Sequence, residues 1–317
     1  MRIFSALLLT SLLMLGAAWG VSAKLIHQQV ADRMAASPQL DGTARRVTGF
    51  PLSFQLVIER PEWRSQDGQA NWHGPELGLH APSLQPNQIT IAFPNRQDLQ
   101  LGLLETTLTA ETMQAMVTIN LDRDLHSAAL EMEAVSLTPA LGITGLSAAH
   151  VNLQHTETAR YALQGHVEGL RLTEVLAETL DPAAELQAAM IDDLQLTGTV
   201  EFASALPLQA PWPAVIALDL TDARLDWGRV QVGLTGQAVR NDAGQYDGRF
   251  DLRLEDWEPI LALLRRYDVI PPDAAMMAAM FFAAQSEPGT NRLSLPLDLR
   301  GSLLSLGPFP LIQLPAL

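Results

Sequence analysis

Short segments in which apolar and polar residues alternate recur along the chain from residue 45 onward. Successive side chains of a strand point to opposite faces, so this alternation predicts half-buried antiparallel strands. Turn-forming pairs such as Asp67-Gly68 and Pro288-Gly289 separate the segments. The sequence therefore predicts a mainly β fold of the α+β class, built on a large, curved antiparallel sheet or a sandwich. The clearest apolar sets are Leu52, Phe54, Leu56 and Ile58; Val117, Ile119 and Leu121; Leu194, Leu196, Val200 and Phe202; and Leu293, Leu295, Leu297 and Leu299.

Two regions change to the helical period and predict two helical inserts, at residues 173–190 and 257–285. In the first, Asp181-Pro182 predicts the end of one helix and the start of a second, which reaches residue 190. In the second, Pro271-Pro272 separates two helical stripes. A strand-like segment precedes each insert, and this common order favours an internal duplication with halves at about 45–190 and 191–317.

The N-terminal run from Ile3 to Ala23 contains no charged residue. A membrane-spanning helix needs about 20 apolar residues, so this run is predicted to be a membrane segment. Its marker positions are Ile3, Leu9, Leu15, Trp19 and Ala23. The range 24–44 is predicted to be a helical linker, and 45–317 the exported β-rich region. The expected location is the periplasm, with an anchor in the inner membrane.

Cleavage is the alternative for the same run, because Val21-Ser22-Ala23 offers the small residues that a signal peptidase accepts. Cleavage after Ala23 would leave a free periplasmic protein. The length of the run and the helical pattern that continues beyond it favour the uncleaved anchor.

Charge and composition narrow the classes of partner. The chain has 20 basic and 35 acidic residues, a net charge of −15, which argues against nucleic acid as a ligand. It contains no cysteine, which excludes disulfides and thiolate metal sites. No protein partner is indicated by these features.

Motifs for catalysis or cofactor binding are not found in the sequence. There is no Gly-x-Ser-x-Gly, no glycine-rich phosphate loop and no His-Glu-x-x-His. The histidines, such as His73 and His80 or His150 and His155, do not have the spacing of a metal site on one element. We therefore expect no catalytic, cofactor-binding or metal-binding residues. Aromatic and methionine side chains near strand and helix ends are candidates for the rim of a ligand site, namely Trp63, Trp257, Met276 and Met280.

Three passages resemble a known family. They are Gly49-Phe50-Pro51; the segment 72–77, with Trp72 and Pro75; and the C-terminal segment 297–311, with Gly301, Gly307 and Pro310. In this order they are similar to the exported alphaproteobacterial proteins catalogued as domain of unknown function 2125, and the resemblance spans nearly the whole chain. It implies an exported protein behind a membrane segment, and it brings no activity and no catalytic residues.

About a dozen one-sided strands present more apolar surface than two helical inserts can cover. That surface must pack on another sheet, curl on itself or remain open for an apolar ligand. Our hypothesis is a non-enzymatic envelope protein that binds an apolar or lipid-like ligand in a β-rich groove. One alternative is a structural or protein-interaction domain of an envelope assembly. Another is an envelope hydrolase, which requires a cleft with two carboxylates or a His–carboxylate pair.

Overall fold

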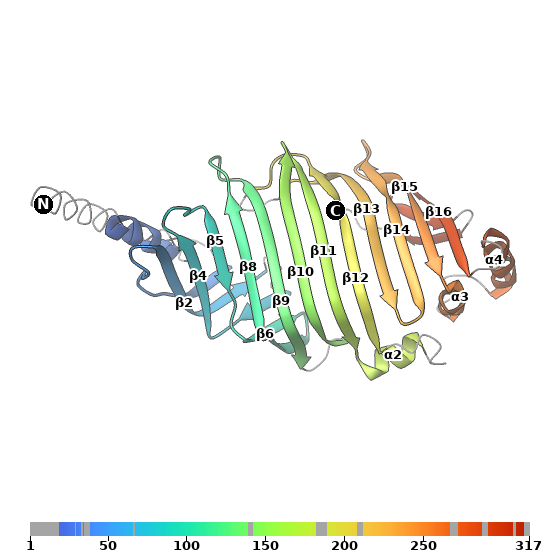
Figure 1. The fold of residues 1–317 in the computed structure, drawn as a ribbon, viewed down its shortest axis with the longest axis horizontal. Coiled ribbons are helices and arrows are strands. Elements are labelled where there is room, and N and C mark those ends of the chain that lie inside the picture. Colours follow the sequence, from blue (N-terminus) through green and yellow to red (C-terminus); the bar gives the residue numbers. More distant parts are fainter. Residues whose placement is uncertain are drawn as a thin grey trace, which may run out of the picture. The chain divides into compact units, whose positions relative to one another are not determined.

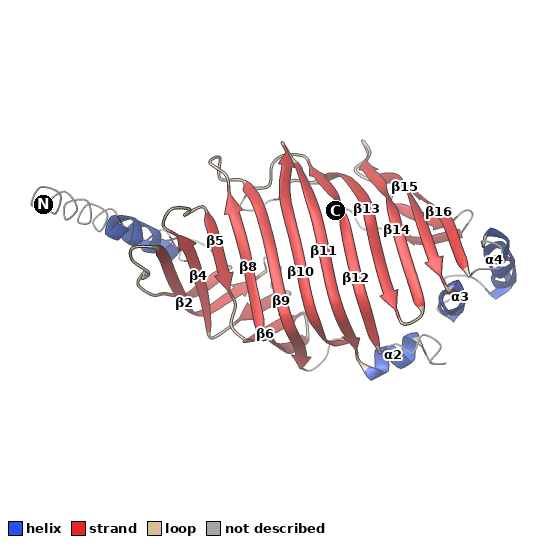
Figure 2. Ribbon diagram, in the orientation of Figure 1, coloured by secondary structure: helices blue, strands red, loops and turns tan. Residues whose placement is uncertain are grey.

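The computed structural model describes residues 19–28, 30–32, 34, 39–65, 67–138, 142–181, 189–207, 212–266, 272–286, 291–306 and 309–313 (Figure 1). Contacts divide these residues into two compact units. Unit 1 is built from the described residues of Met1–Asp122 and His126–Leu141, and unit 2 from those of Arg123–Leu125 and Gly142–Leu317. Antiparallel strands dominate both units, which confirms the mainly β class (Figure 2).

Unit 1 is an antiparallel structure in which the long strand β2 belongs to two branches. The first half of β2 pairs with β4, and this branch continues through β5 to β8. The second half pairs with β3, and that branch continues through β6 and β7 to the end of β9. The strands are β1 (Leu40–Ala44), β2 (Ser53–Arg64), β3 (Ala70–His73), β4 (Glu76–Pro82), β5 (Gln88–Ala92), β6 (Arg96–Leu101), β7 (Leu104–Thr109), β8 (Thr112–Ile119) and β9 (Leu125–Thr138).

The two branches separate at Arg60. Its φ of 47° lies in the left-handed region, which non-glycine residues seldom adopt. Its N–H donates a hydrogen bond to the carbonyl of Pro75, 2.9 Å away, in the connection between β3 and β4. The ladder with β4 ends at Glu59, and the ladder with β3 begins at Glu62. This local irregularity lets one strand change partner, and it places β3, β6 and β7 together in the second branch.

The predicted alternation on β2 is confirmed from Phe54 to Ile58. Phe54, Leu56 and Ile58 are buried, and each such side chain contributes about 1.5–3 kcal/mol relative to exposure. Leu52, predicted to belong to the same series, is 81% exposed because β2 begins only at Ser53. Leu121 is likewise fully exposed because β8 ends at Ile119. Both predictions were wrong, since the alternating pattern continues past the strand into a turn.

Unit 2 is a meander in which each strand pairs antiparallel with the next, as Figure 1 shows for β10 to β16. The helices α3 and α4 lie beside the β16 end of this sheet (Figure 2). The elements are β10 (Ile143–Glu157), β11 (Arg160–Leu172), α2 (Glu174–Leu180), β12 (Met190–Phe202), β13 (Val215–Trp227), β14 (Val230–Arg240), β15 (Tyr246–Glu255), α3 (Trp257–Arg266), α4 (Pro272–Gln285), β16 (Arg292–Arg300), β17 (Leu303–Leu306) and β18 (Phe309–Gln313).

The main core of unit 2 lies where β15 and β16 meet the helices. Cross-strand partners such as Phe250 and Leu297 share one face of the sheet and are both buried. Trp257 and Leu261 of α3 and Phe282 of α4 pack in the same cluster. The predicted apolar series Leu293, Leu295, Leu297 and Leu299 is buried at every position.

The helical inserts are confirmed in part. The second insert forms α3 and α4, and α4 begins at Pro272, where the missing N–H costs no hydrogen bond. In the first insert, Thr173 caps α2 by accepting a hydrogen bond from the Leu176 N–H. The second helix of this insert was predicted to reach Met190, but Met190 is the first residue of strand β12. Residues 182–188, the rest of that predicted helix, lie outside the described residues. Both inserts belong to unit 2, and the two units divide near residue 141.

The N-terminal helical residues 19–28 pack within unit 1, on the turn before β2 and on β2 itself. Ala23 is buried against Val47, Phe54 and Leu56, and Trp19 packs beside it. No helix among the described residues has the length and apolar character required to cross a bilayer. Of the marker positions of the predicted membrane segment, Ile3, Leu9 and Leu15 lie outside the described residues. The end of the predicted linker forms strand β1, which pairs with β2.

Candidate functional site

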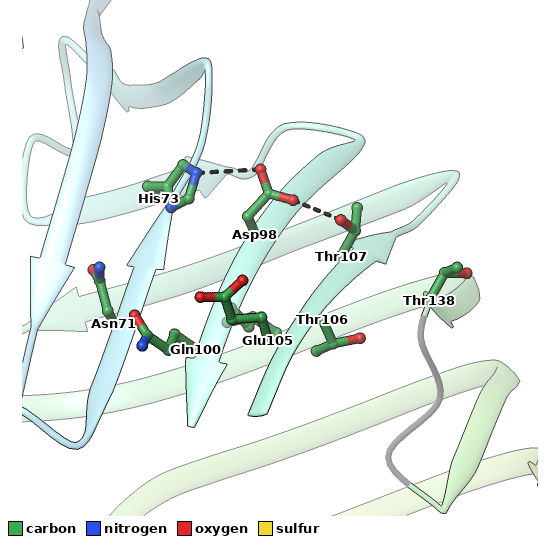
Figure 3. Close-up of a pocket in the computed structure, with 9 residues that line it drawn as sticks. Asn71, His73, Asp98, Gln100, Glu105, Thr106, Thr107 and Thr138 are labelled. Carbon is green, nitrogen blue, oxygen red and sulfur yellow. Dashed lines mark hydrogen bonds and ion pairs between the residues drawn. The ribbon is translucent and has the colours of Figure 1, made fainter. Parts of the chain in front are cut away.

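A polar pocket of about 490 Å³ opens in unit 1 (Figure 3). The pocket is lined by the second branch of unit 1, in which β3, β6, β7 and the end of β9 pair side by side. The lining residues are Asn71, His73, Asp98, Leu99, Gln100, Glu105, Thr106, Thr107 and Thr138.

Three of these side chains form a chain of polar contacts, drawn as dashed lines in Figure 3. His73 Nε2 lies 3.2 Å from Asp98 Oδ2, and Thr107 Oγ1 donates a hydrogen bond of 2.6 Å to Asp98 Oδ1. In a nucleophile-activating triad the imidazole stands between the hydroxyl and the carboxylate. Here the carboxylate stands in the middle, so the arrangement differs from such a triad.

Beneath this pocket, an internal polar network fixes β3 and β6. Trp72 Nε1 donates a hydrogen bond of 2.7 Å to Oε1 of Gln97, which is 2% exposed. Gln97 Nε2 in turn donates to the carbonyl of Pro94, and the Trp72 ring meets Phe93 edge to face at 6.0 Å. A buried amide with its hydrogen bonds made is stabilising, whereas an unpaired one costs free energy. The pocket wall is therefore held rigidly.

A second candidate site is one face of the unit 2 sheet. Because cross-strand partners share a face, the registers place apolar residues from seven consecutive strands together; we call this set the apolar face. It comprises Ala149, Val151, Leu153, Leu163, Val167, Leu194, Leu196, Val200, Leu218, Leu220, Ala223, Leu225, Val230, Val232, Leu234, Ala238, Phe250, Leu252, Leu254, Leu293, Leu295, Leu297 and Leu299.

The apolar face is sealed at one end and more open at the other. On β16, Leu295 and Leu299 are each 1% exposed and belong to the core cluster that also contains Trp257, Leu261 and Phe282 of the helices. On β10 and β12, Val151 is 40% and Leu194 39% exposed. Their neighbour Leu196 is half buried. The β10–β12 end therefore presents apolar side chains that the described residues do not fully cover.

The first group of family-motif residues forms the turn before β2. Gly49 has a φ of 100°, and a Cβ there would lie 2.7 Å from the carbonyl oxygen of Ser53, so only glycine fits. Phe50 precedes a cis peptide bond to Pro51 and meets the Trp19 ring edge to face at 5.4 Å. These residues form part of the surface on which the N-terminal helical residues 19–28 pack.

The other motif residues lie elsewhere in the two units. Trp72 belongs to the polar network of unit 1, and Pro75 accepts the Arg60 hydrogen bond. In unit 2, Gly301 turns the chain between β16 and β17 with a φ of 58°. Pro310 lies in β18 opposite Ser305, and Gly307 falls outside the described residues.

The candidate rim residues do not form one site. Trp63 lies on β2, opposite Trp72 of β3, and is 39% exposed. Trp257 packs in the core, where its ring meets Phe282 edge to face at 5.6 Å, so it is not a rim residue. Met276 and Met280 on α4 are 75% and 68% exposed. Trp63 belongs to unit 1 and the others to unit 2.

Sequence reasoning missed two His–carboxylate pairs. His73 and Asp98 meet because β3 pairs with β6, and His166 Nε2 lies 2.8 Å from Asp193 Oδ2 because β11 pairs with β12. Only strand register joins these residues, and local motifs carry no signal for it. Among the described residues, no group of three or more metal-binding side chains converges.

The fold and these surfaces define a mainly antiparallel β protein with a polar pocket in one unit and an apolar sheet face in the other. Residues 16–315 match the model of the bacterial family described as an uncharacterised conserved protein, domain of unknown function 2125. The chain belongs to this family, which confirms the resemblance seen in its motifs. Neither the curated proteins nor the solved structures contain a significant match to the chain.

Proposed function

We propose that this protein is a non-enzymatic component of the bacterial envelope, which binds the acyl chain of a lipid-like ligand on the apolar face of unit 2. The carrying observation is the incomplete cover of that face on β10 and β12, where Val151 and Leu194 remain about two-fifths exposed. Large contiguous apolar patches are uncommon on soluble surfaces and mark binding sites. The proposal includes tethering of the chain to the inner membrane by its N-terminal apolar run.

Apolar contact suits an acyl chain because the exposed end of the face offers side chains without hydrogen-bonding groups. Leu153, Leu163 and Leu196, which adjoin the exposed pair in the sheet register, are half buried. Burial of apolar surface contributes about 25 cal/mol per Å², so covering these side chains with an acyl chain favours binding. The opposite face of the same strands carries His150, Gln164 and Gln195 and is polar.

Native mass spectrometry of the full chain extracted from membranes tests this proposal. We expect the wild type to carry one more bound lipid than the double variant V151Q/L194Q, because two polar side chains then interrupt the face. The matched control is Leu121→Gln, at a fully exposed position of unit 1, which should retain the adduct. A wild type free of lipid, or an adduct equal in all three proteins, would overturn the proposal.

The rival function is a protein-interaction domain of an envelope assembly. Its discriminating experiment is crosslinking in cells, with photoreactive residues placed at positions 151 and 194. Crosslinks to one reproducible protein, together with the absence of a lipid adduct, would favour the rival. Crosslinks to lipid would support the apolar-face proposal.

A further inference from the structure

A second pocket lies where the N-terminal helix meets unit 1. Its volume is about 380 Å³, and its described lining residues are Trp19, Gly20, Ala23, Lys24, His27, Arg46 and Val47. We call it the N-helix pocket. Lys24 and His27 are three residues apart on one helix and therefore lie on the same side of it. Arg46 comes from the segment between β1 and β2, so the basic side chains converge from two elements.

The walls of the N-helix pocket are fixed by packing. The Trp19 ring stacks on Phe54, and its Nε1 donates a hydrogen bond of 3.2 Å to the carbonyl of Ser53. His27 Nε2 lies 3.3 Å from the carbonyl oxygen of Ala44. Val47 is buried beneath them. The Trp19, His27 and Val47 part of the wall is therefore ordered before a ligand binds, which lowers the cost of binding.

The charge of the N-helix pocket is opposite to that of the whole chain. The net charge is −15, yet no carboxylate is among the described residues that line this pocket. Lys24 and Arg46 form no ion pair with any described residue. The adjacent Arg45, by contrast, is paired with Glu59. Two cations without an ion-pair partner among the described residues, both lining one pocket, favour an anionic ligand.

We propose that the N-helix pocket binds a phosphate ester, with Lys24 and Arg46 as its charged ligands and the Trp19 indole against the carbon next to the ester. Arginine matches the geometry of phosphate oxygens with two parallel donors, and lysine adds a mobile point charge. Tryptophan provides an apolar face with a polar edge, as aromatic residues do at membrane surfaces. The phosphate is that of a lipid headgroup or of a soluble ester.

The assignment of the phosphate to a lipid headgroup rests on the proposed function, because it requires the N-terminal apolar run to insert into a membrane. The phosphate chemistry does not, since it depends only on the pocket. The unit 2 variant V151Q/L194Q leaves the N-helix pocket untouched and should bind phosphate esters as the wild type does. Failure of this inference and failure of the proposed function therefore give different results.

Isothermal titration calorimetry of the full chain in a non-ionic detergent tests the inference. The titrants are dihexanoyl phosphatidic acid, glycerol 3-phosphate and inorganic phosphate. We expect Lys24→Ala and Arg46→Ala each to weaken phosphatidic acid binding by about tenfold or more, because each removes a charged contact. Arg45→Ala removes the same charge at the neighbouring position and should change the affinity less than about twofold. Lys24→Arg should retain binding.

The titrants also separate the two sources. Tighter binding of phosphatidic acid than of glycerol 3-phosphate supports the site and assigns it to a lipid headgroup. Equal binding of the two supports the site and assigns it to a soluble ester. No binding of any titrant overturns the inference, as does an Arg45→Ala variant weakened as much as Arg46→Ala. Lys24 and Arg46 are exposed, so an unchanged thermal midpoint will show that the variants are folded.

Discussion

Trp19 stacks face to face on Phe54, with ring centroids 5.5 Å apart and ring planes inclined by 8°. Trp19 lies within the predicted membrane segment, and Phe54 lies on strand β2 of unit 1. The C-terminal end of that segment is therefore part of the packing of unit 1. Cleavage after Ala23 would remove Trp19 and separate Ala23 from its contacts with Val47.

The first prediction concerns this aromatic pair. Trp19→Ala should destabilise unit 1 by about 2–3 kcal/mol, less than for a fully buried tryptophan because Trp19 is only half buried. Chemical denaturation of the full chain in detergent measures the change. Trp212→Ala is the control, since Trp212 is 74% exposed, and its cost should stay within about 0.5 kcal/mol. Equal effects of the two substitutions would contradict the packing role of Trp19.

The second prediction is that the N-terminal segment stays attached in the cell. Ala23 is 7% exposed, so the predicted cleavage site is enclosed once unit 1 has folded. Intact mass spectrometry of the protein purified from membranes should give a mass that includes Trp19. A mature protein that begins at Lys24 would contradict the prediction, and it would turn the proposed anchored protein into a free one.

The third prediction concerns the sealed end of the apolar face. Leu295→Ala should cost about 2–5 kcal/mol, because Leu295 is 1% exposed and its loss leaves a cavity in the main core of unit 2. The denaturation midpoint of unit 2 is the measurement. Leu121→Ala makes the same chemical change at a fully exposed position and should leave the midpoint unchanged. A Leu295→Ala midpoint equal to that of the wild type would show that this core is loosely packed.

The strands of unit 2 could be predicted from the sequence because their pattern is strict. The leucines of β16 alternate without a break, and all four positions are buried. The prediction was wrong where the apolar pattern continues beyond the end of the strand or helix. Leu52 and Leu121 keep the alternation but lie in turns, and Met190 fits a helical stripe but begins β12.

The polar pocket could not be predicted from local pattern. His73 and Asp98 are far apart in the sequence. Their contact depends on the pairing of β3 with β6 in the second branch, which separates from the first at Arg60. The separation of the two branches depends on the left-handed conformation of Arg60 and on one backbone hydrogen bond from its N–H to the Pro75 carbonyl. Neither has a sequence signal comparable to alternation. By contrast, the apolar face follows from alternation once the meander register is known.

The fourth prediction concerns the acid sensitivity of the turn at Gly301. The Gly301 N–H donates a hydrogen bond of 2.7 Å to Asp247 Oδ1, and this contact, with a second from the Asn241 side chain, lowers the pKa of the Asp247 carboxyl. Because the pKa is lower in the folded state, the stabilisation is complete above the unfolded value of about 3.9 and is lost as the pH falls through the folded value.

Asp247→Asn should therefore lower the thermal midpoint at neutral pH, and its effect should shrink at strongly acidic pH, where the carboxylate becomes protonated in the folded protein as well. Differential scanning calorimetry at the two pH values measures this difference. Asp242→Asn removes a carboxylate from the same hairpin loop, without the Gly301 contact, and should not reproduce the effect. An Asp247→Asn effect of equal size at both pH values would rule out the ionised carboxylate as its source.

The last prediction compares two buried tyrosines of unit 2. The Tyr161 hydroxyl donates a hydrogen bond of 3.1 Å to the carbonyl of Leu125 and accepts one of 3.0 Å from the Leu206 N–H. Tyr161 thereby ties the segment 123–125 to β11. The Tyr246 hydroxyl makes one such bond, donated to the carbonyl of Val215 at 2.9 Å.

Tyr161→Phe leaves two backbone groups without their partner, whereas Tyr246→Phe leaves one. An unsatisfied buried polar group costs about 1–3 kcal/mol, so Tyr161→Phe should destabilise unit 2 by roughly twice as much as Tyr246→Phe. Urea denaturation of both variants measures the difference, and each serves as the control for the other because the chemical change is the same. A larger loss of stability in Tyr246→Phe than in Tyr161→Phe would contradict the prediction. It would mean that the Leu125 carbonyl and the Leu206 N–H find other hydrogen-bond partners, such as water, when the Tyr161 hydroxyl is removed. Hydrogen exchange at the Leu206 amide tests this directly, since slow exchange in Tyr161→Phe requires that the amide find another acceptor within the protein.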